Sequence, residues 1–392
     1  MGIKSVILRT TEAPATRGIP GAGPATAAPS APVAIEVDDL SVGRAANLAR
    51  RADVVAVAPV MPMRLISPVD TGVTAAPAAP GVTWGVQAVG ADTSPFTGDG
   101  VVVAVLDTGI DPDHPAFAGV QLVRRNFTTG GDDDEHGHGT HCAGTIFGRD
   151  VSNTRIGVAR GVTKAVIGKV LGPGGGGSDQ VMQAIQWAIG EGANVVSMSL
   201  GIDFPGFVKQ LEDDGLPTEL ATSIALEGYR ANVLLFERLA SLINAQNAFM
   251  QATLMIAAAG NESQRDVNPD FEIAVSPPAV ADGIVSVAAL ENLPQGLKVA
   301  SFSNTGARIS GPGVGVISAK AGGGLVGMSG TSMATPHVAG VAALWAQKLT
   351  IGGSLSAQLL ANQLIGQATT QGLGAGFDPG DIGAGIVRAP QS

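Results

Sequence analysis

Five short, mostly apolar runs separated by segments of helical patterning restrict the fold of this sequence more than any other feature. Val101–Leu106 is the clearest, because all of its residues are apolar and it suits a strand buried on both faces of a sheet. The other runs are Ala165–Leu171, Val195–Leu200, Leu254–Ala259 and Gly283–Ala289. The helical patterns are His138–Phe147, Gln180–Gly190, a long one within Leu220–Gln251, and Pro336–Lys348. This alternation predicts an α/β fold, with a doubly wound, mostly parallel sheet and helices on both faces.

The composition of the 392 residues narrows the class of protein. Hydrophobic residues make up 45% of the chain and aromatic residues only 4%, so we expect a large core packed closely from small side chains. The 33 acidic and 23 basic residues give a net charge of −10, which argues against a nucleic-acid-binding surface. No apolar run reaches the roughly 18 residues that a membrane-spanning helix needs.

The first 66 residues are predicted to form a separate, small α+β domain. Its expected elements are strands at 3–9, 33–37 and 54–57, a helix at 38–51 and an extended tail at 60–66. Residues 11–32 are rich in Pro, Ala and Gly and are expected to form a disordered loop. A linker at 67–82 of similar composition separates this domain from a larger one at 83–392. A domain of about 65 residues is near the lower size limit for independent stability.

The stretch Ser329–Gly340 has the features of a tight turn that presents a hydroxyl at the start of a helix. Gly330 and its small neighbours allow a sharp turn, and Pro336 suits the first turn of the helix that follows. Ser332 is then expected near the positive end of that helix, beside free backbone N–H groups. Such a position suits a nucleophile whose reaction develops a negative oxygen. Because serine alone is a weak nucleophile, this hypothesis requires a base and an orienting acid elsewhere in the chain.

Asp107 and His138 are the candidates for these two roles. Asp107 follows the strand predicted at Val101–Leu106, and functional residues gather at the carboxyl ends of parallel strands. His138 has a glycine on each side and opens a predicted helix. Taken singly, Asp107 is better explained by a turn and His138 by a structural role. Together with Ser332 they give the chain order Asp, His, Ser, each in a glycine-bounded context.

Three motifs together resemble the subtilisin family of serine proteases, the subtilases. They are Val-Ala-Val-Leu-Asp107-Thr-Gly-Ile-Asp, His138-Gly-Thr-His-Cys-Ala-Gly-Thr and Gly330-Thr-Ser332-Met-Ala-Thr-Pro-His-Val-Ala-Gly. The similarity covers residues 83 to about 390. The resemblance implies a serine endopeptidase that forms an acyl-enzyme on Ser332. In that scheme Asp107 orients His138, which acts as general base and then as general acid.

The same resemblance implies further site residues. Asn261 matches the side-chain donor of the oxyanion hole, with the Ser332 backbone N–H as the second donor. Two segments match the walls of the pocket for the residue before the scissile bond, namely Ser199, Leu200 and Gly201, and Ala258, Ala259 and Gly260. These small, uncharged walls favour a neutral or apolar side chain. The edge that pairs with substrate is expected at Val170–Asp179, with Gly174 and Gly175 as binding residues. A mobile loop explains Gly174–Gly177 equally well.

The N-terminal domain resembles, by its position, a subtilase propeptide of the inhibitor type. Its tail at 60–66 is expected to block the cleft, and processing is expected between Ile66 and Pro80. The alternative is a permanent N-terminal module. A segment at about 203–250 is longer than in compact secreted subtilases and is expected to be an insertion. Two roles are open for this insertion: it shapes substrate specificity near the cleft, or it is a surface elaboration far from the substrate.

One loop of the sequence is a candidate metal site. No cofactor is expected for the chemistry, but the acidic loop Gly130–His138 offers four carboxylates that suit a structural calcium ion or simply face solvent. The spacing of His136, His138 and His141 does not match a His-Glu-x-x-His zinc motif, and His141 and His337 are best interpreted as structural. Cys142, the single cysteine, is expected to be a buried small hydrophobe and excludes an internal disulfide.

The function expected is therefore proteolysis of polypeptides by a precursor that inhibits itself. The alternatives are a dedicated peptide-processing or transpeptidase-type subtilase, and a non-catalytic peptide-binding module on the same fold. The apolar run in the first ten residues is too short for a signal peptide. The compartment is thus open between the cytoplasm and secretion, which the family resemblance favours.

Overall fold

The computed structural model describes residues 2–10, 33–72, 81–246 and 251–392. The predicted disordered loop at 11–32 and half of the predicted linker, residues 73–80, lie outside these residues. In the part described, no helix is both long and apolar enough to span a membrane.

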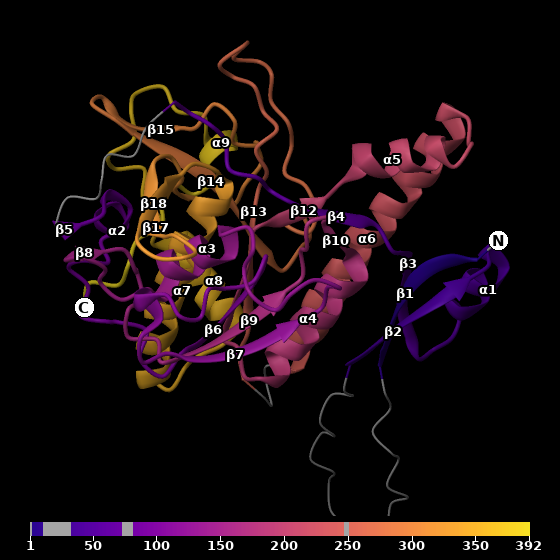
Figure 1. Ribbon diagram of the computed structural model, residues 1–392, viewed down its shortest axis with the longest axis horizontal. Coiled ribbons are helices and arrows are strands. Elements are labelled where there is room, and N and C mark those ends of the chain that lie inside the picture. Colours follow the sequence, from indigo (N-terminus) through magenta and orange to yellow (C-terminus); the bar gives the residue numbers. More distant parts are fainter. Residues whose placement is uncertain (1, 11–32, 73–80, 247–250) are drawn as a thin grey trace, which may run out of the picture.

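An eight-stranded sheet forms the centre of the molecule (Figure 1). Its path runs β15-β14-β13-β11-β6-β9-β7, and β16 also pairs with β14. Every pairing is parallel except that of β15, which is antiparallel to β14. The strands are β6 (Val102–Asp107), β7 (Gln121–Asn126), β9 (Lys164–Lys169), β11 (Val195–Met198), β13 (Leu254–Ala258), β14 (Ile284–Leu293), β15 (Gly296–Val299) and β16 (Ile309–Pro312). All five predicted apolar runs lie in this sheet.

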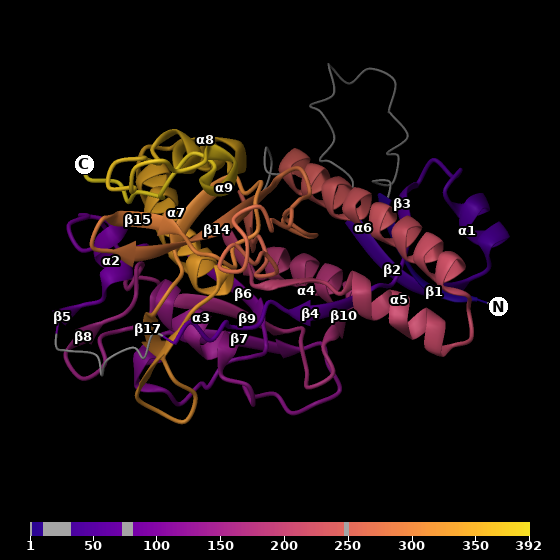
Figure 2. The ribbon, with the colours of Figure 1, turned by 90° about the horizontal axis from the view of Figure 1, so that it is seen from above.

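Helices cover both faces of the sheet, as the alternation of patterns predicts (Figure 2). Successive residues of β6 point to opposite faces. Val103 and Val105 belong to the core shared with α3 (His138–Phe147) and α7 (Thr331–Ile351). Ala104 and Leu106 belong to the core shared with α4 (Ser178–Gly190) and α6 (Thr218–Gln246). The predicted fold class, a doubly wound and mostly parallel α/β sheet, is confirmed.

Two predicted helix boundaries are wrong. The helix expected at Pro336–Lys348 begins five residues earlier, at Thr331, so Pro336 lies inside α7 and not in its first turn. The helix expected at 38–51 is shorter, because α1 spans Val42–Leu48 and begins after the N-cap Ser41. Residues 38–40 continue the preceding strand, β2 (Val33–Leu40), where they pair with the first residues of β1 (Ile3–Thr10).

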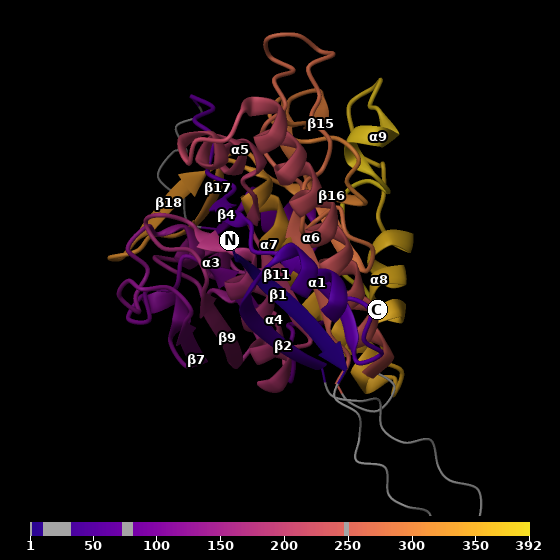
Figure 3. The ribbon, with the colours of Figure 1, turned by 90° about the vertical axis from the view of Figure 1, so that its right-hand side faces the viewer.

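The N-terminal region is a three-stranded antiparallel sheet in the order β2-β1-β3, with β3 spanning Val54–Pro59. It lies against α4 and α6 (Figures 1 and 3). Val6, Leu8, Ala56 and Ala58 are buried in the same apolar cluster as side chains of α4 and α6. This sheet therefore has its buried face in common with the larger domain.

Beyond β3 the chain enters the larger domain as a strand, β4 (Pro62–Leu65), the predicted extended tail. It pairs antiparallel with β10 (Gly176–Gly177) on one side and with β12 (Leu200–Ile202) on the other. The tail thus becomes the middle strand of a small second sheet.

The remaining elements connect or flank these layers. They are β5 (Gly81–Val82), α2 (Trp84–Ala88), η1 (Pro115–Phe117), β8 (Thr154–Arg155), α5 (Phe204–Asp213), β17 (Val316–Ala319), β18 (Leu325–Met328), α8 (Ala357–Gly366) and α9 (Pro379–Ile382).

Candidate active site

Asp107 and His138 meet at the carboxyl edge of the central sheet. Asp107 ends β6 and His138 is the first residue of α3. The Nδ1 of His138 lies 2.8 Å from Oδ1 of Asp107, and both side chains are buried. Nε2 of the same imidazole has no hydrogen-bond partner among the described residues. The imidazole is therefore fixed through one nitrogen, and its other nitrogen is left for another group.

The environment of His138 raises its pKa well above the usual value for histidine. Burial is the largest single influence and lowers this pKa. The negative charge of Asp107, the Cys142 side chain and their hydrogen bonds act in the opposite direction and together outweigh burial.

A buried carboxylate, Asp134, organises the start of α3. The N-cap of this helix is Gly137, whose backbone is left-handed and which offers no capping side chain. Asp134 replaces it, because its carboxylate accepts hydrogen bonds from the backbone N–H of Gly137 and from the backbone N–H and hydroxyl of Thr140. The hydroxyl of Thr108 donates to Asp134 and accepts from the N–H of Gly139. The N–H groups on either side of His138 are thereby held in place.

Ser332 is the second residue of α7, so its backbone N–H is one of those left free at a helix start. The carbonyl of Ser332 is also freed, because Pro336, four residues on, has no N–H to donate to it. That carbonyl accepts instead from the hydroxyl of Ser199, at 3.3 Å, and from the thiol of Cys142, at 3.4 Å. The Cys142 sulfur also lies 3.8 Å from His138 Nδ1. Cys142, a residue of α3, therefore contacts both His138 and the first turn of α7.

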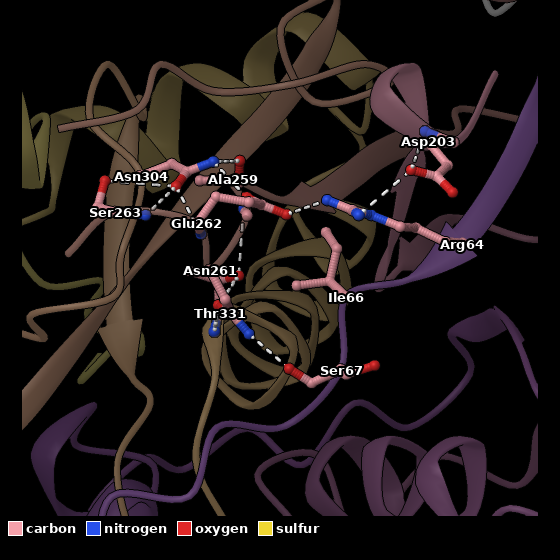
Figure 4. A network of polar contacts seen from close by, with 12 residues as sticks. Arg64, Ile66, Ser67, Asp203, Ala259, Asn261, Glu262, Ser263, Asn304 and Thr331 are labelled. Atoms are coloured by element: carbon pink, nitrogen blue, oxygen red, sulfur yellow. Dashed lines mark hydrogen bonds and ion pairs between the residues drawn. The ribbon is translucent and has the colours of Figure 1, made fainter. Parts of the chain in front are cut away.

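Asn261 follows β13 and lies at the start of α7 (Figure 4). Its side-chain oxygen accepts hydrogen bonds from the N–H of Thr331, at 2.9 Å, and from the hydroxyl of Thr331, at 2.8 Å. This fixes the amide orientation and turns the NH₂ group away from Thr331. The NH₂ group donates to the carbonyl of Ser67 at 2.9 Å.

The tail that carries Ser67 runs past Ser332. The hydroxyl of Ser332 donates to the carbonyl of Ile66 at 2.7 Å, and the N–H of Ile66 donates to the carbonyl of Ser199. Farther along, the N–H of Val69 donates to the carbonyl of Ser329. The chain is therefore held on both sides of the bond between Ile66 and Ser67.

One predicted pocket wall, Ser199–Gly201, lies beside Ile66, whose side chain is buried. Leu200 and Gly201 belong to β12, and a Cβ on Gly201 would stand 3.8 Å from the Cδ1 of Ile66. Ala258, Ala259 and Gly260 close the end of β13, and the N–H of Gly260 donates to the hydroxyl of Thr331.

The glycine edge differs in detail from the expectation. Gly174 and Gly175 line a groove of about 490 Å³ beside Met63, Leu65 and His136. The strand pairing itself is made by the next two residues, since Gly176 pairs with Met63 and Gly177 with Pro62. Because Gly174–Gly177 are four identical residues, the sequence does not indicate which two of them pair with the tail and which two line the groove. Sequence reasoning also missed Thr331 and the carboxylates of Asp203 and Glu262.

The carboxylates of the acidic loop bind different protein groups. Asp132 accepts from Asn126, Asp133 pairs with Arg124, and Asp134 serves α3. Among the described residues, the only group of three acidic, His or Cys side chains whose ligand atoms converge is Asp107, His138 and Cys142. No group of three such side chains converges within the acidic loop itself, which lies in the described part of the chain.

His141 and His337 have structural surroundings. The ring of His141 bonds to the carbonyl of Val316, and burial lowers its pKa to about 3. The ring of His337 bonds to the carbonyl of Met333, and burial lowers its pKa to about 4. Both stay neutral near pH 7. Cys142 is free and buried, as expected.

Comparison with known proteins identifies the family. The model of the subtilase family matches residues 98–378. An intracellular serine protease of Paenibacillus polymyxa is 33% identical over 300 residues, which cover 74% of this chain and 79% of the relative. Subtilisin Savinase of Lederbergia lenta is 34% identical over 320 residues, covering 79% of this chain and 98% of the relative. A thermostable alkaline protease of Halalkalibacterium halodurans is 36% identical over 271 residues, covering 67% of this chain and 62% of the relative. The chain therefore belongs to the subtilase family and is a serine endopeptidase.

Proposed function

We propose that Ser332, His138 and Asp107 form the catalytic triad, with Asn261 and the backbone N–H of Ser332 as the oxyanion hole. The observation that carries this proposal is the hydrogen bond from the Ser332 hydroxyl to the carbonyl of a peptide bond that lies across the site. The fixed imidazole of His138 and the fixed amide of Asn261 support it.

In the first half of the reaction, Oγ of Ser332 attacks the carbonyl carbon and its proton passes to Nε2 of His138. The negative charge on the carbonyl oxygen is stabilised by Asn261 Nδ2 and the Ser332 N–H. His138 then gives the proton to the leaving amine, the C–N bond breaks, and an ester remains on Ser332. Water attacks that ester in the second half, again with His138 as base, and releases the acid. Asp107 holds the imidazole orientation and stabilises its cationic form throughout.

The residue before the scissile bond is proposed to be neutral or apolar. Ile66, the tail residue that we assign to this position, is buried and lies beside Gly201 of the first proposed wall, Ser199–Gly201, with Ala258–Gly260 as the second proposed wall. No charged side chain belongs to these walls.

We further propose that the N-terminal region inhibits the enzyme and is removed by cleavage between Ile66 and Ser67. The tail pairs with both edges of the cleft, which is how an extended peptide is recognised by an exposed sheet edge. Asn261 donates to the carbonyl of Ser67 and not to that of Ile66. The Ile66 carbonyl must therefore turn toward the oxyanion hole before attack, so the docked tail is an inhibitor first and a substrate second.

Refolding the full chain tests both proposals. The wild-type chain should release a fragment ending at Ile66, and sequencing of the larger product should begin at Ser67. The Ser332→Ala variant should stay intact and should not react with a fluorophosphonate, whereas Ser354→Ala, an exposed serine outside the site, should behave as wild type. An intact wild-type chain that reacts with the fluorophosphonate would contradict the processing proposal alone. Processing in Ser332→Ala would contradict the triad.

The subtilase chemistry needs no cofactor. The calcium ion expected from the acidic loop finds no converging ligands among the described residues there, so we assign no metal to this site.

A further inference from the structure

We propose that Asp203 and Glu262 form a binding site for a basic side chain in the third residue before the scissile bond, so that the enzyme prefers substrates with arginine at that position. The inference rests on the proposed function, in which Ile66 is the residue before the scissile bond. Counting back from Ile66, the third residue is Arg64.

Arg64 of the docked tail is held by two carboxylates from separate parts of the larger domain (Figure 4). One guanidinium nitrogen lies 2.8 Å from Oε1 of Glu262, and the other lies 3.3 Å from Oδ1 of Asp203. The backbone of Arg64 pairs with Gly201 of β12. The side chain therefore leaves the paired strand and extends over the rim of the cleft between the two acids.

Each carboxylate is fixed by contacts that do not involve the tail side chain. Oε2 of Glu262 accepts from the side-chain NH₂ of Asn304 at 2.7 Å, and Asn304 is buried and accepts from the N–H of Glu262. Asp203 is the N-cap of α5, and its side chain accepts from the N–H of Gly206. The N–H of Asp203 also donates to the carbonyl of Pro62 in the tail. The side-chain contacts belong to the larger domain, so we expect them to orient the two carboxylates after the tail leaves.

The electrostatics of the free cleft favour a cation at this place. Among the described residues, Arg64 is the only cation in an ion pair with Asp203 or Glu262. Removal of the tail leaves two negative charges directed at one point, and a basic substrate side chain relieves their repulsion. Arginine suits the site better than lysine, because its planar fork reaches both carboxylates at once.

The strength of the preference follows from the exposure of the three side chains. The exposed fraction is 42% for Arg64, 28% for Asp203 and 36% for Glu262, so solvent weakens each pair. We expect a preference for arginine over glutamine of about tenfold in kcat/KM at low salt, shrinking at high ionic strength.

The test compares three fluorogenic peptides that differ at one residue, acetyl-Met-Arg-Leu-Ile, acetyl-Met-Gln-Leu-Ile and acetyl-Met-Glu-Leu-Ile, each with an amine leaving group. The full chain, allowed to process itself, is expected to cleave the arginine peptide fastest and the glutamate peptide slowest. The arginine-to-glutamine ratio should fall close to one in an Asp203→Asn/Glu262→Gln double variant. Asparagine keeps the N-cap role at position 203.

The matched control is Asp213→Asn, which removes one carboxylate from the exposed end of α5, where Asp213 pairs with Lys209. This variant should keep the wild-type ratio. Equal cleavage of the arginine and glutamine peptides by the wild-type enzyme would overturn the inference, even if the double variant failed to fold. Hydrolysis of none of the peptides would contradict the proposed function and the inference with it.

Discussion

At the scale of single residues, Thr331 decides the direction in which the Asn261 amide points. Both the N–H and the hydroxyl of Thr331 donate to its oxygen. We expect Thr331→Val to keep the shape of the side chain and the bond from the backbone N–H, but to remove the hydroxyl that donates to the amide oxygen and accepts from the N–H of Gly260. The amide of Asn261 is then held less firmly, which lowers kcat by about tenfold with little change in KM, as loss of one hydrogen bond predicts. Kinetics on a peptide substrate measure this.

Two further variants serve as the positive and the negative control for this prediction. Asn261→Leu removes the donor itself and should lower kcat by about 10² to 10³. Thr335→Val makes the same change one turn along α7, where the hydroxyl donates to a helix carbonyl and does not contact Asn261, and should leave kcat near wild type. Equal effects of the two threonine variants would contradict an orienting role for Thr331.

The pKa of His138 gives a second prediction at this scale. The imidazole accepts the Ser332 proton only when neutral, so activity is lost as the pH falls through its pKa. Because the structure with the docked tail raises that pKa, we expect the rate of self-processing to be half-maximal above pH 6.5. The rate of fragment release, measured from about pH 5 to 10 with circular dichroism as a control for folding, checks this. A midpoint below pH 6.5 would contradict it.

At the scale of elements, the start of α3 depends on Asp134 and not on the helix's own N-cap. We expect Asp134→Ala to lower the free energy of unfolding by about 3 kcal/mol, since several buried donors lose a charged acceptor, and to lower kcat through His138. Asp133→Ala, which removes an exposed neighbour, is the control. Denaturation is measured in a Ser332→Ala background to prevent self-digestion.

The same carboxylate has a pH signature. Burial raises the pKa of Asp134, but its hydrogen bonds from Thr140, Gly137 and Thr108 lower it by more, so the net shift is downward. A depressed pKa stabilises the fold above the unfolded value, near about 3.9, and this contribution is lost as the pH falls through the folded value. The stability difference between wild type and Asp134→Ala should therefore shrink in acid. A difference that stays constant as the medium is acidified through this range would contradict it.

Element boundaries show where sequence reasoning stops. Five of the eight strands of the central sheet, β6, β9, β11, β13 and β14, were predictable because each lies in a mostly apolar run. The other three, β7, β15 and β16, were not: β7 and β15 carry polar and exposed residues, and β16 is a run of only four residues that includes Gly and Pro. The start of α7 was not, because proline favours a first turn and nothing in the sequence shows that the carbonyl of Ser332 has partners from β11–β12 and α3. Asp107, His138, Ser332 and Asn261 were predicted as site residues from the motifs. The ion pairs of Arg64 with Asp203 and Glu262 were not predicted, because these partners are 139 and 198 residues away in the chain.

At the scale of the whole molecule, the N-terminal sheet shares its core with the larger domain. The buried face of β1 and β3 packs in one apolar cluster with α4 and α6. We expect a peptide of residues 1–66 to be largely unfolded alone and to gain strand structure when mixed with the inactive larger domain, because only then is that face buried. Circular dichroism of the peptide with and without its partner measures this, and a cooperatively folded free peptide would contradict it.

The position of β4 as the middle strand of the small sheet has a consequence for how activity begins. While Ile66 and Ser67 are joined, the tail occupies the cleft at an effective concentration set by the chain itself, of about millimolar order for a short flexible tether, and dilution does not change it. Cutting that bond converts the same contacts into a complex of two molecules, which dissociates when diluted. When the enzyme is diluted after the bond has been cut, the lag before peptide hydrolysis should therefore be shorter. When it is diluted while the bond is intact, the time that the cut itself takes should not depend on the dilution.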